Sequence, residues 1–217
     1  RDYSGETKHD LVRVVDFDNP ENNDFMAINQ LTVLQGDFNR RPDIVLYVNG
    51  LPLVMIELKN ATDSKASQLA AYRQIQTYKC EISDTFRFNE LCVISDGIDA
   101  QMGTITSPFE RMMPWKTIEG EKESSNVPQM DVLARGVFDK ARLLDIIQSF
   151  IVFERDDKDD TKFSKKVAAY HQYWVVNKSL LSTLRASGEQ GDQRAGVVWH
   201  TQGSGKSLSM VFYTGKM

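Results

Sequence analysis

Residues 41–59 read Arg-Pro-Asp-Ile-Val-Leu-Tyr-Val-Asn-Gly-Leu-Pro-Leu-Val-Met-Ile-Glu-Leu-Lys, and this stretch decides the fold. Residues 43–48 and 53–58 are nearly continuous apolar runs, as expected for strands that are covered on both faces. Asn49-Gly50 between them is a strong signal for a tight hairpin turn. The sequence therefore predicts two buried strands that pair with each other.

The neighbouring segments extend and cover these two strands. Residues 24–35 mix apolar and polar side chains like a further strand, residues 64–81 have the apolar spacing of a helix, and residues 91–95 form another short apolar strand. This order predicts a compact α/β core over residues 24–97, a mixed sheet flanked by helices. Residues 98–130 are rich in Gly, Pro and Ser and predict loops.

The C-terminal part predicts more helix and a second unit. Residues 137–154 have a helical pattern, and a helical extension over residues 130–155 would complete a first domain of residues 1–155. The charged run at residues 154–160 predicts a solvated linker. Residues 165–186 predict another helix, residues 196–199 a short buried strand, and residues 208–213 the start of a helix. We therefore expect a domain boundary near residues 155–162 and a second unit over residues 156–217.

Charged side chains stand at the ends of the two apolar strands. Glu57 and Lys59 are two residues apart in a strand and project from the same face. A strict two-residue turn would pair residue 43 with residue 56 and put Asp43 on the opposite face. A loop one residue longer, or one bulge, pairs residue 48 with 52 and Asp43 with Glu57, and Pro52 favours such an irregular turn. We predict this longer register, which brings Asp43, Glu57 and Lys59 together.

Two facing carboxylates repel each other unless a divalent cation lies between them. Oxygen ligands with an open coordination sphere suit Mg²⁺, which can activate a water molecule for attack on a phosphodiester. Lys59 would orient or deprotonate that water, or stabilise the charge of the transition state. The alternative is a solvated ion pair of Glu57 with Lys59 or Arg41. The sequence thus indicates a candidate metal site with Asp43 and Glu57 as ligands.

A second motif lies at residues 198–207, Val-Trp-His-Thr-Gln-Gly-Ser-Gly-Lys-Ser. A short apolar strand that leads into a glycine-rich loop and a helix is typical of a phosphate-binding loop, although the full pattern has Gly where His200 stands. Lys206 would reach the outer phosphates and Ser207 would bind Mg²⁺. The alternative is a plain loop that joins strand to helix. The candidate phosphate-binding residues are Gly203, Ser204, Gly205, Lys206 and Ser207.

The composition sets limits on the function. The chain has 217 residues, 41% of them hydrophobic and 26% charged, which excludes collagen-like, disordered and coiled-coil chains. No apolar run is long enough to span a membrane. Cys80 and Cys92 lack the spacing of a zinc site or disulfide framework, so a reducing cytosol is expected. The net charge of −4 lacks the basic character of most DNA-binding proteins, so any contact with DNA must come from a local patch, a bound metal or a partner.

The residues at 41–46, 48–54 and 56–60 closely resemble the nuclease core of the motor–restriction (R) subunit of type I restriction enzymes. The resemblance implies a PD-(D/E)xK restriction-endonuclease-like core, with Asp43, Glu57 and Lys59 in the catalytic positions. The family also has a Q-x-x-x-Y motif on the following helix. Two pairs fit this motif, Gln74 with Tyr78 and Gln68 with Tyr72, and Gln74-Ile-Gln-Thr-Tyr-Lys79 is the closer likeness.

The phosphate loop resembles the ATP site of the same subunit, which lies in a RecA-like P-loop ATPase domain of the superfamily 2 helicases. The resemblance implies that His200 belongs to the family's own variant of the loop. Residues 167–174 resemble the segment in which these motors place an adenine-reading glutamine, here Gln172. Because the chain stops at Met217, before the other ATPase motifs, we expect that the fragment itself does not hydrolyse ATP.

The resemblance implies Mg²⁺-dependent cleavage of double-stranded DNA, coupled in the full protein to ATP-driven translocation. It also implies a cytoplasmic complex with methyltransferase and specificity subunits, in which a partner reads the DNA sequence. One alternative is a nuclease fold that is catalytically inert and serves as a module that binds DNA or partners. A second alternative is a scaffold whose α/β core docks another protein.

Overall fold

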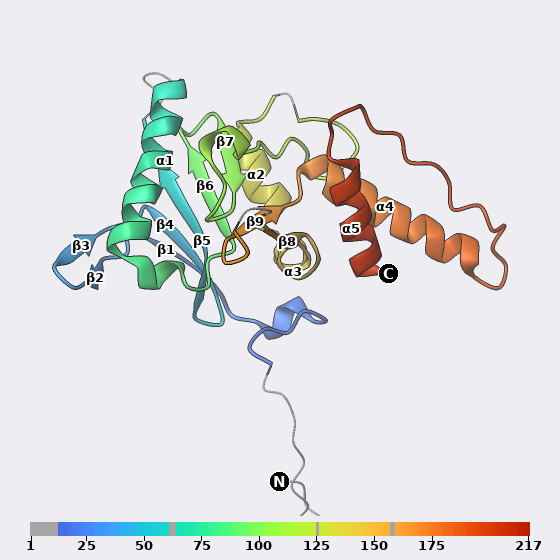
Figure 1. The fold of residues 1–217 in the computed structure, drawn as a ribbon, viewed down its shortest axis with the longest axis horizontal. Helices are drawn as coiled ribbons and strands as arrows, with labels where there is room; N and C mark the ends of the chain where they lie inside the picture. The colour runs from blue at the N-terminus through green and yellow to red at the C-terminus, as the bar shows by residue number, and fades with distance from the viewer. Residues whose placement is uncertain (1–12, 61–63, 125, 157–158) are drawn as a thin grey trace, which may run out of the picture.

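The computed structural model describes residues 13–217, apart from residues 61–63, 125 and 157–158. Its core is a five-stranded sheet with the strand order β1-β4-β5-β6-β7 (Figure 1). Strands β5 and β6 are parallel and are joined through helix α1, whereas the other neighbouring strands are antiparallel. The prediction of a mixed α/β sheet with helical cover is thus confirmed. The elements are β1 (Phe25–Asn29), β4 (Ile44–Val48), β5 (Leu51–Leu58), α1 (Ser64–Glu81), β6 (Leu91–Ser95) and β7 (Ala100–Gly103).

Helix α1 covers one face of the sheet (Figure 1). Met55 of β5 and Ile94 of β6 pack on this face against Ile75 and Tyr78 of α1, and all four are buried. Side chains alternate along a strand, so Glu57 lies on the same face as Met55. The face beneath α1 is therefore the face on which the candidate acids must meet.

The opposite face of the sheet packs against the later helices. These are α2 (Gln129–Val137), α3 (Lys140–Ser149), α4 (Tyr170–Ser187) and α5 (Lys206–Lys216). One apolar cluster joins Ile56 and Val93 of the sheet to Leu133 of α2, Tyr173 of α4 and Phe212 of α5. The predicted domain boundary near residues 155–162 stays a prediction. Three short 3-10 helices complete the helical elements described: η1 (Pro20–Asn22), η2 (Ser83–Phe86) and η3 (Phe109–Arg111).

The hairpin between β4 and β5 combines a tight turn with a bulge. Val48 pairs with Leu51 across Asn49 and Gly50, whose φ angles of 50° and 81° fit a two-residue turn with both central residues in the left-handed region. The predicted pairing of residue 48 with 52 is therefore wrong. The extra residue enters at Leu53, because Tyr47 pairs with Pro52 and Leu46 with Val54. Beyond this bulge the register is the predicted one.

The first predicted strand is divided in two. Strand β1 ends at Asn29, and Gln30 has a φ of 55°, which turns the chain out of the sheet. Residues 33–35 instead form β2 (Val33–Gln35), which pairs with β3 (Phe38–Arg40) in a separate hairpin. A second difference is β7, which lies in the stretch predicted as loops and pairs with β6 through Val93 and Met102.

The predicted helix over residues 137–154 is confirmed over residues 140–149 and wrong over residues 151–154, which form a strand. The predicted helical extension over residues 130–155 is likewise helical only as far as Ser149. Helix α2 ends at Val137, and Asp139 caps α3 by accepting a hydrogen bond from the backbone N–H of Arg142 at 3.0 Å. After α3 the chain forms β8 (Ile151–Arg155), which pairs with β9 (Phe163–Val167). A short apolar run such as residues 150–153 fits either a helix or a strand, and pairing with β9 makes it a strand here. Of the charged run predicted as a linker, Glu154 and Arg155 belong to β8, and residues 157–158 lie outside the described residues.

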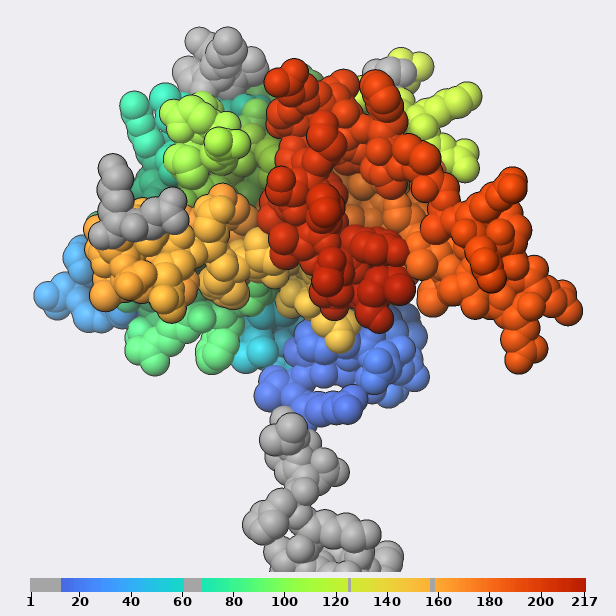
Figure 2. Space-filling model, turned by 45° about the vertical axis from the view of Figure 1, so that its right-hand side comes forward, coloured from blue at the N-terminus to red at the C-terminus, as the bar shows by residue number. Residues whose placement is uncertain are grey.

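The predicted buried strand at residues 196–199 is also wrong. Val197 is 93% exposed and Trp199 is 88% exposed, and the described part of the chain places no strand beside them. An unpaired strand leaves its backbone groups without partners, so the segment stays irregular. Figure 2 shows this C-terminal segment, in red, on the surface of the molecule. Within the described residues, none of the helices combines the length and apolar character that crossing a membrane requires.

Candidate functional site

Asp43 and Glu57 lie at the ends of neighbouring strands. Ile44 of β4 pairs with Ile56 of β5, and continuing this register by one residue places Asp43 across from Glu57. The Asp43 carboxylate reaches the next strand, because its Oδ2 accepts a hydrogen bond of 2.8 Å from the backbone N–H of Leu58. The structure thus brings the two predicted acids to one face of the sheet.

Glu57 is a buried carboxylate with one satisfied oxygen. Its Oε1 accepts a hydrogen bond from Lys59 Nζ at 2.8 Å, whereas Oε2 is buried and has no hydrogen-bond partner among the described residues. Burial raises the pKa of Glu57, the Lys59 ammonium lowers it, and the nearby charge of Asp43 raises it again, with a net rise. The ion pair with Lys59 therefore does not fully compensate the buried negative charge.

Lys59 connects this buried acid to the solvent. Its side chain is 35% exposed, whereas that of Glu57 is 3% exposed. Its backbone N–H donates to Ser95 O at 2.9 Å, which fixes the end of β5 against β6. The predicted ion pair of Glu57 with Lys59 is present, and the one with Arg41 is not among the described ion pairs. This ion pair gives Glu57 Oε1 a hydrogen-bond partner, but it explains neither the burial of Oε2 nor the presence of Asp43 nearby.

Tyr78 of α1 packs over the two acids and is 4% exposed. Its hydroxyl donates to Arg41 O at 3.5 Å, next to the strand end that carries Asp43. Burial raises the pKa of Tyr78, and the charges of Glu57 and Asp43 and a side-chain contact with Glu57 raise it further, whereas a contact with Gln74 lowers it, with a net rise. The hydroxyl therefore stays protonated at neutral pH; Tyr78 lies next to the acids, and Gln74 lies next to Tyr78.

The second candidate pair on α1 faces elsewhere. The Tyr72 hydroxyl donates to Ser107 O at 3.1 Å, and its ring packs edge-on against Phe109 with 5.5 Å between the centroids. Gln68 is buried and lies about 1.7 helical turns before Gln74. The geometry thus separates the two tyrosines: Tyr78 lies at the acids and Tyr72 does not.

A surface cavity of about 460 Å³ opens beside Asp43 and Lys59. Its wall includes Gln30, whose Nε2 donates to Asp43 Oδ1 at 3.0 Å. Gln30 was not predicted from the sequence, because it stands at the end of a mixed strand with no motif around it. Its only signal is its position, since the residue after β1 faces the residue before β4 across the ladder.

The donors at this site suit a hard cation such as Mg²⁺. Glu57 Oε2 is a buried acceptor without a partner among the described residues, and Asp43 offers further lone pairs beside it. The residues therefore fit a cation held by two carboxylates and water. In the described ranges, no group of three or more His, Cys, Asp and Glu side chains is arranged to hold a metal.

The phosphate loop precedes α5 and contains two glycines with positive φ. Gly203 has a φ of 79° and Gly205 a φ of 78°, and Gly205 is the N-cap of the helix. A Cβ atom at Gly205 would lie 2.5 Å from Gln172 Nε2, so a side chain at this position would displace the Gln172 amide. Lys206 starts the helix, two residues earlier than predicted, and its Nζ donates to Thr201 O at 3.1 Å.

Gln172 binds the phosphate loop through its amide. Its Nε2 donates to Gly205 O at 3.0 Å, and its Oε1 accepts from the backbone N–H of Ala169 at 2.9 Å. His171 makes a neighbouring contact of 3.1 Å between its Nε2 and Ser204 O. In this arrangement both ends of the Gln172 amide are engaged by backbone, and its predicted contact with adenine stays a prediction.

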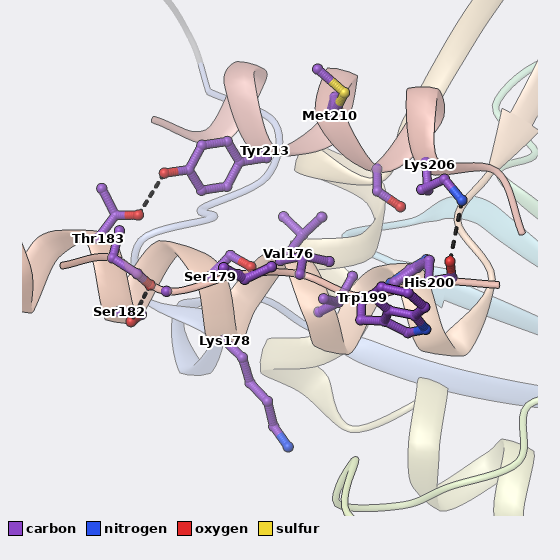
Figure 3. Close-up of a pocket in the computed structure, with 16 residues that line it drawn as sticks. Val176, Lys178, Ser179, Ser182, Thr183, Trp199, His200, Lys206, Met210 and Tyr213 are labelled. Carbon is purple, nitrogen blue, oxygen red and sulfur yellow. Dashed lines mark hydrogen bonds between the residues drawn. The ribbon is translucent and has the colours of Figure 1, made fainter. Parts of the chain in front are cut away.

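A second cavity of about 750 Å³ lies between α4, α5 and residues 195–200 (Figure 3). Lys206 lies at one end of it, where its Nζ donates to His200 O at 3.2 Å. Tyr213 and Thr183 close the other end with a hydroxyl contact of 2.7 Å. Burial lowers the pKa of His200, and the charges of His171 and Lys206 lower it further, so His200 is neutral at pH 7.

Comparisons with known proteins show which families this chain is similar to. The SWI2/SNF2 ATPase family matches residues 171–217, which contain the phosphate loop. The type I restriction enzyme HindI endonuclease subunit of Haemophilus influenzae is 46% identical over 99% of this chain and 20% of its own length. A provisionally named type I restriction enzyme endonuclease subunit of Methanocaldococcus jannaschii, MjaIXP, is 29% identical over 98% of this chain and 22% of its own length.

The chain therefore spans about a fifth of the length of these curated relatives. The family described as type I restriction enzyme R protein N terminus matches residues 2–111. This range contains β1 to β7, helix α1 and the five residues predicted for the nuclease site, Asp43, Glu57, Lys59, Gln74 and Tyr78. With this match and the relatives above, the chain belongs to the family of type I restriction enzyme R proteins.

Proposed function

We propose that this chain is the nuclease segment of an R subunit and that it hydrolyses phosphodiester bonds of double-stranded DNA with Mg²⁺. One observation carries the proposal: two carboxylates meet at neighbouring strand ends, and one of them keeps a buried oxygen without a partner among the described residues. Burying a charge without compensation costs folding free energy, and such charges are concentrated at functional sites. The reaction that two neighbouring carboxylates and a lysine support best is metal-assisted hydrolysis.

Asp43 and Glu57 would hold the cation, which supplies a water of lowered pKa and neutralises charge on the phosphate. Lys59 would donate from its exposed ammonium to the attacking water or the phosphate oxygen, while its bond to Glu57 keeps it in place. Tyr78 would hold the strand that carries Asp43 through its bond to Arg41 O. Gln74 would support Tyr78 from the same helix.

Contact with DNA would come from local groups and partner subunits. The chain has a net charge of −4, so it lacks the broad positive surface that drives non-specific binding. Lys59 and Arg41 supply positive charges beside the cavity. The DNA sequence would be read by a specificity subunit, in a cytoplasmic complex that also holds a methyltransferase subunit. The match to restriction endonuclease subunits supports such an assembly.

The phosphate loop would bind ATP and Mg²⁺ in the full-length protein and couple cleavage to movement along DNA. Gly203 and Gly205 supply positive φ angles, Ser204 lies between them, and α5 directs the N–H groups of its first turn toward the loop. Lys206 would exchange its bonds with backbone carbonyls for the outer phosphates, and Ser207 would bind Mg²⁺. The match to an ATPase family over these residues supports this part of the proposal.

Two tyrosines of α1 provide a matched test of the proposed nuclease site. Tyr78→Phe in the full-length subunit is expected to lower the rate of plasmid cleavage about tenfold, the loss of one hydrogen bond at the reacting site. Tyr72→Phe removes a hydroxyl from the same helix that bonds to Ser107 O, so cleavage should stay at the level of the unmodified protein. The rates are measured with purified complex on agarose gels. Equal rates for the two variants would contradict the assignment of Tyr78 to the site.

A further inference from the structure

Gln30 occupies a strained position at the edge of the cavity. Its φ of 55° lies in the left-handed region, which residues other than glycine seldom adopt. Its backbone N–H donates to Asp43 O at 2.8 Å, which continues the ladder between β1 and β4 by one residue. The backbone bond and the bend together hold the Gln30 side chain over Asp43.

The Gln30 amide bridges a cation and an anion. Its Oε1 accepts hydrogen bonds from Arg41 Nε at 2.7 Å and from Arg41 Nη2, and its Nε2 donates to Asp43 Oδ1 at 3.0 Å. A guanidinium group only donates hydrogen bonds and an ionised carboxylate only accepts them. An amide satisfies both neighbours at once, and these neighbours fix which way the amide points.

Without this amide, Arg41 and Asp43 would be expected to form an ion pair. They are two residues apart and carry opposite charges, and a direct bond between guanidinium and carboxylate is stronger than a bond from either to a neutral amide. Arg40 next to them shows the usual outcome, because it forms an ion pair with Glu81. Arg41, in contrast, is in no ion pair with any acid that the structure describes.

We propose that Gln30 is a positioning residue that keeps Arg41 and Asp43 from forming an ion pair. Asp43 then keeps the second lone pair of each oxygen for the divalent cation, and the guanidinium keeps its remaining N–H donors for a DNA phosphate. This inference rests on the proposed function, since it assigns both freed groups to the nuclease reaction. It adds Gln30 and Arg41 to the residues of the site.

The test is the affinity of this chain for Mn²⁺, measured by isothermal titration calorimetry. Gln30→Met keeps the length of the side chain and removes the bridge, so Arg41 should close on Asp43 and weaken Mn²⁺ binding about tenfold, the lower range for lost support of a metal ligand. Adding Arg41→Met to this variant removes the competing cation and should restore the affinity of the unmodified chain. Such a rescue would not follow if Gln30 had only a structural role.

Gln35 provides the matched control. Its amide also bridges two groups, because Nε2 donates to Ser83 Oγ at 3.0 Å and Oε1 accepts from the N–H of Asp84 at 3.0 Å, but these lie outside the cavity. Gln35→Met should leave Mn²⁺ affinity unchanged. Melting curves by circular dichroism check that each variant folds.

Three results would count against the inference. Unchanged affinity in Gln30→Met would overturn it while the proposed nuclease function stands. A double variant as weak as Gln30→Met would overturn the role of Arg41 as competitor, and with it the inference. An unmodified chain that binds no Mn²⁺ would remove the proposed function itself, and the inference would go with it.

Discussion

Replacing Asp43 with alanine in the full-length subunit is expected to abolish cleavage of duplex DNA, with a loss on the order of 10³-fold or more. Asp43 would supply half of the protein ligands of the cation, and Glu57 alone, with one oxygen bonded to Lys59, would not hold it in place. The loss is measured as the rate at which supercoiled plasmid is converted to linear product. Asp43→Asn should lose as much, because it keeps the shape and removes the charge.

Asp37→Ala is the control for this experiment. Asp37 is an exposed carboxylate in the turn between β2 and β3, so its removal changes the net charge equally but leaves the strand ends intact. Cleavage by Asp37→Ala should match that of the unmodified protein. If Asp43→Ala cut DNA at the normal rate, the nuclease fold would be inert here and another part of the enzyme would break the bond.

The second large effect is expected at the phosphate loop. Lys206→Ala should lower ATP hydrolysis by the full-length protein by roughly 10²-fold or more, because the outer phosphates would lose the cation that stabilises their charge in the transition state. Phosphate release is measured with saturating DNA. Lys178→Ala is the matched control, since Lys178 also borders the cavity between α4 and α5 but donates to Gly120 O at 3.3 Å. Equal activity of the two variants would argue against nucleotide binding at the loop.

The sequence predicts the centre of the sheet well, because local rules govern it. Asn49-Gly50 marks a turn that needs two positive φ angles, and both residues adopt them. The alternation of side chains along β5 then requires Glu57 and Lys59 to share a face, and the ion pair between them agrees. The helix predicted at residues 64–81 matches α1, so its cover of that face also follows from local pattern.

The parts that sequence alone missed depend on distant partners. The bulge at Leu53 fixes the register, but the sequence offered Pro52 as a reason for an extra residue in the turn itself. Strand β8 continues the apolar pattern of α3, and it is pairing with β9 that makes it a strand. Val197 and its neighbours read as a buried strand but lie exposed. Gln30 acts through side-chain bonds between β1 and β4, which no spacing in the sequence encodes.

The central claim is that Asp43 and Glu57 hold one divalent cation between them. Diffraction from crystals of this chain soaked in Mn²⁺, measured near the manganese absorption edge, tests it directly. We predict a single strong anomalous peak in contact with both carboxylates, on the side of the sheet that α1 covers. A peak that contacts neither acid, or its absence at these strand ends, would contradict the account.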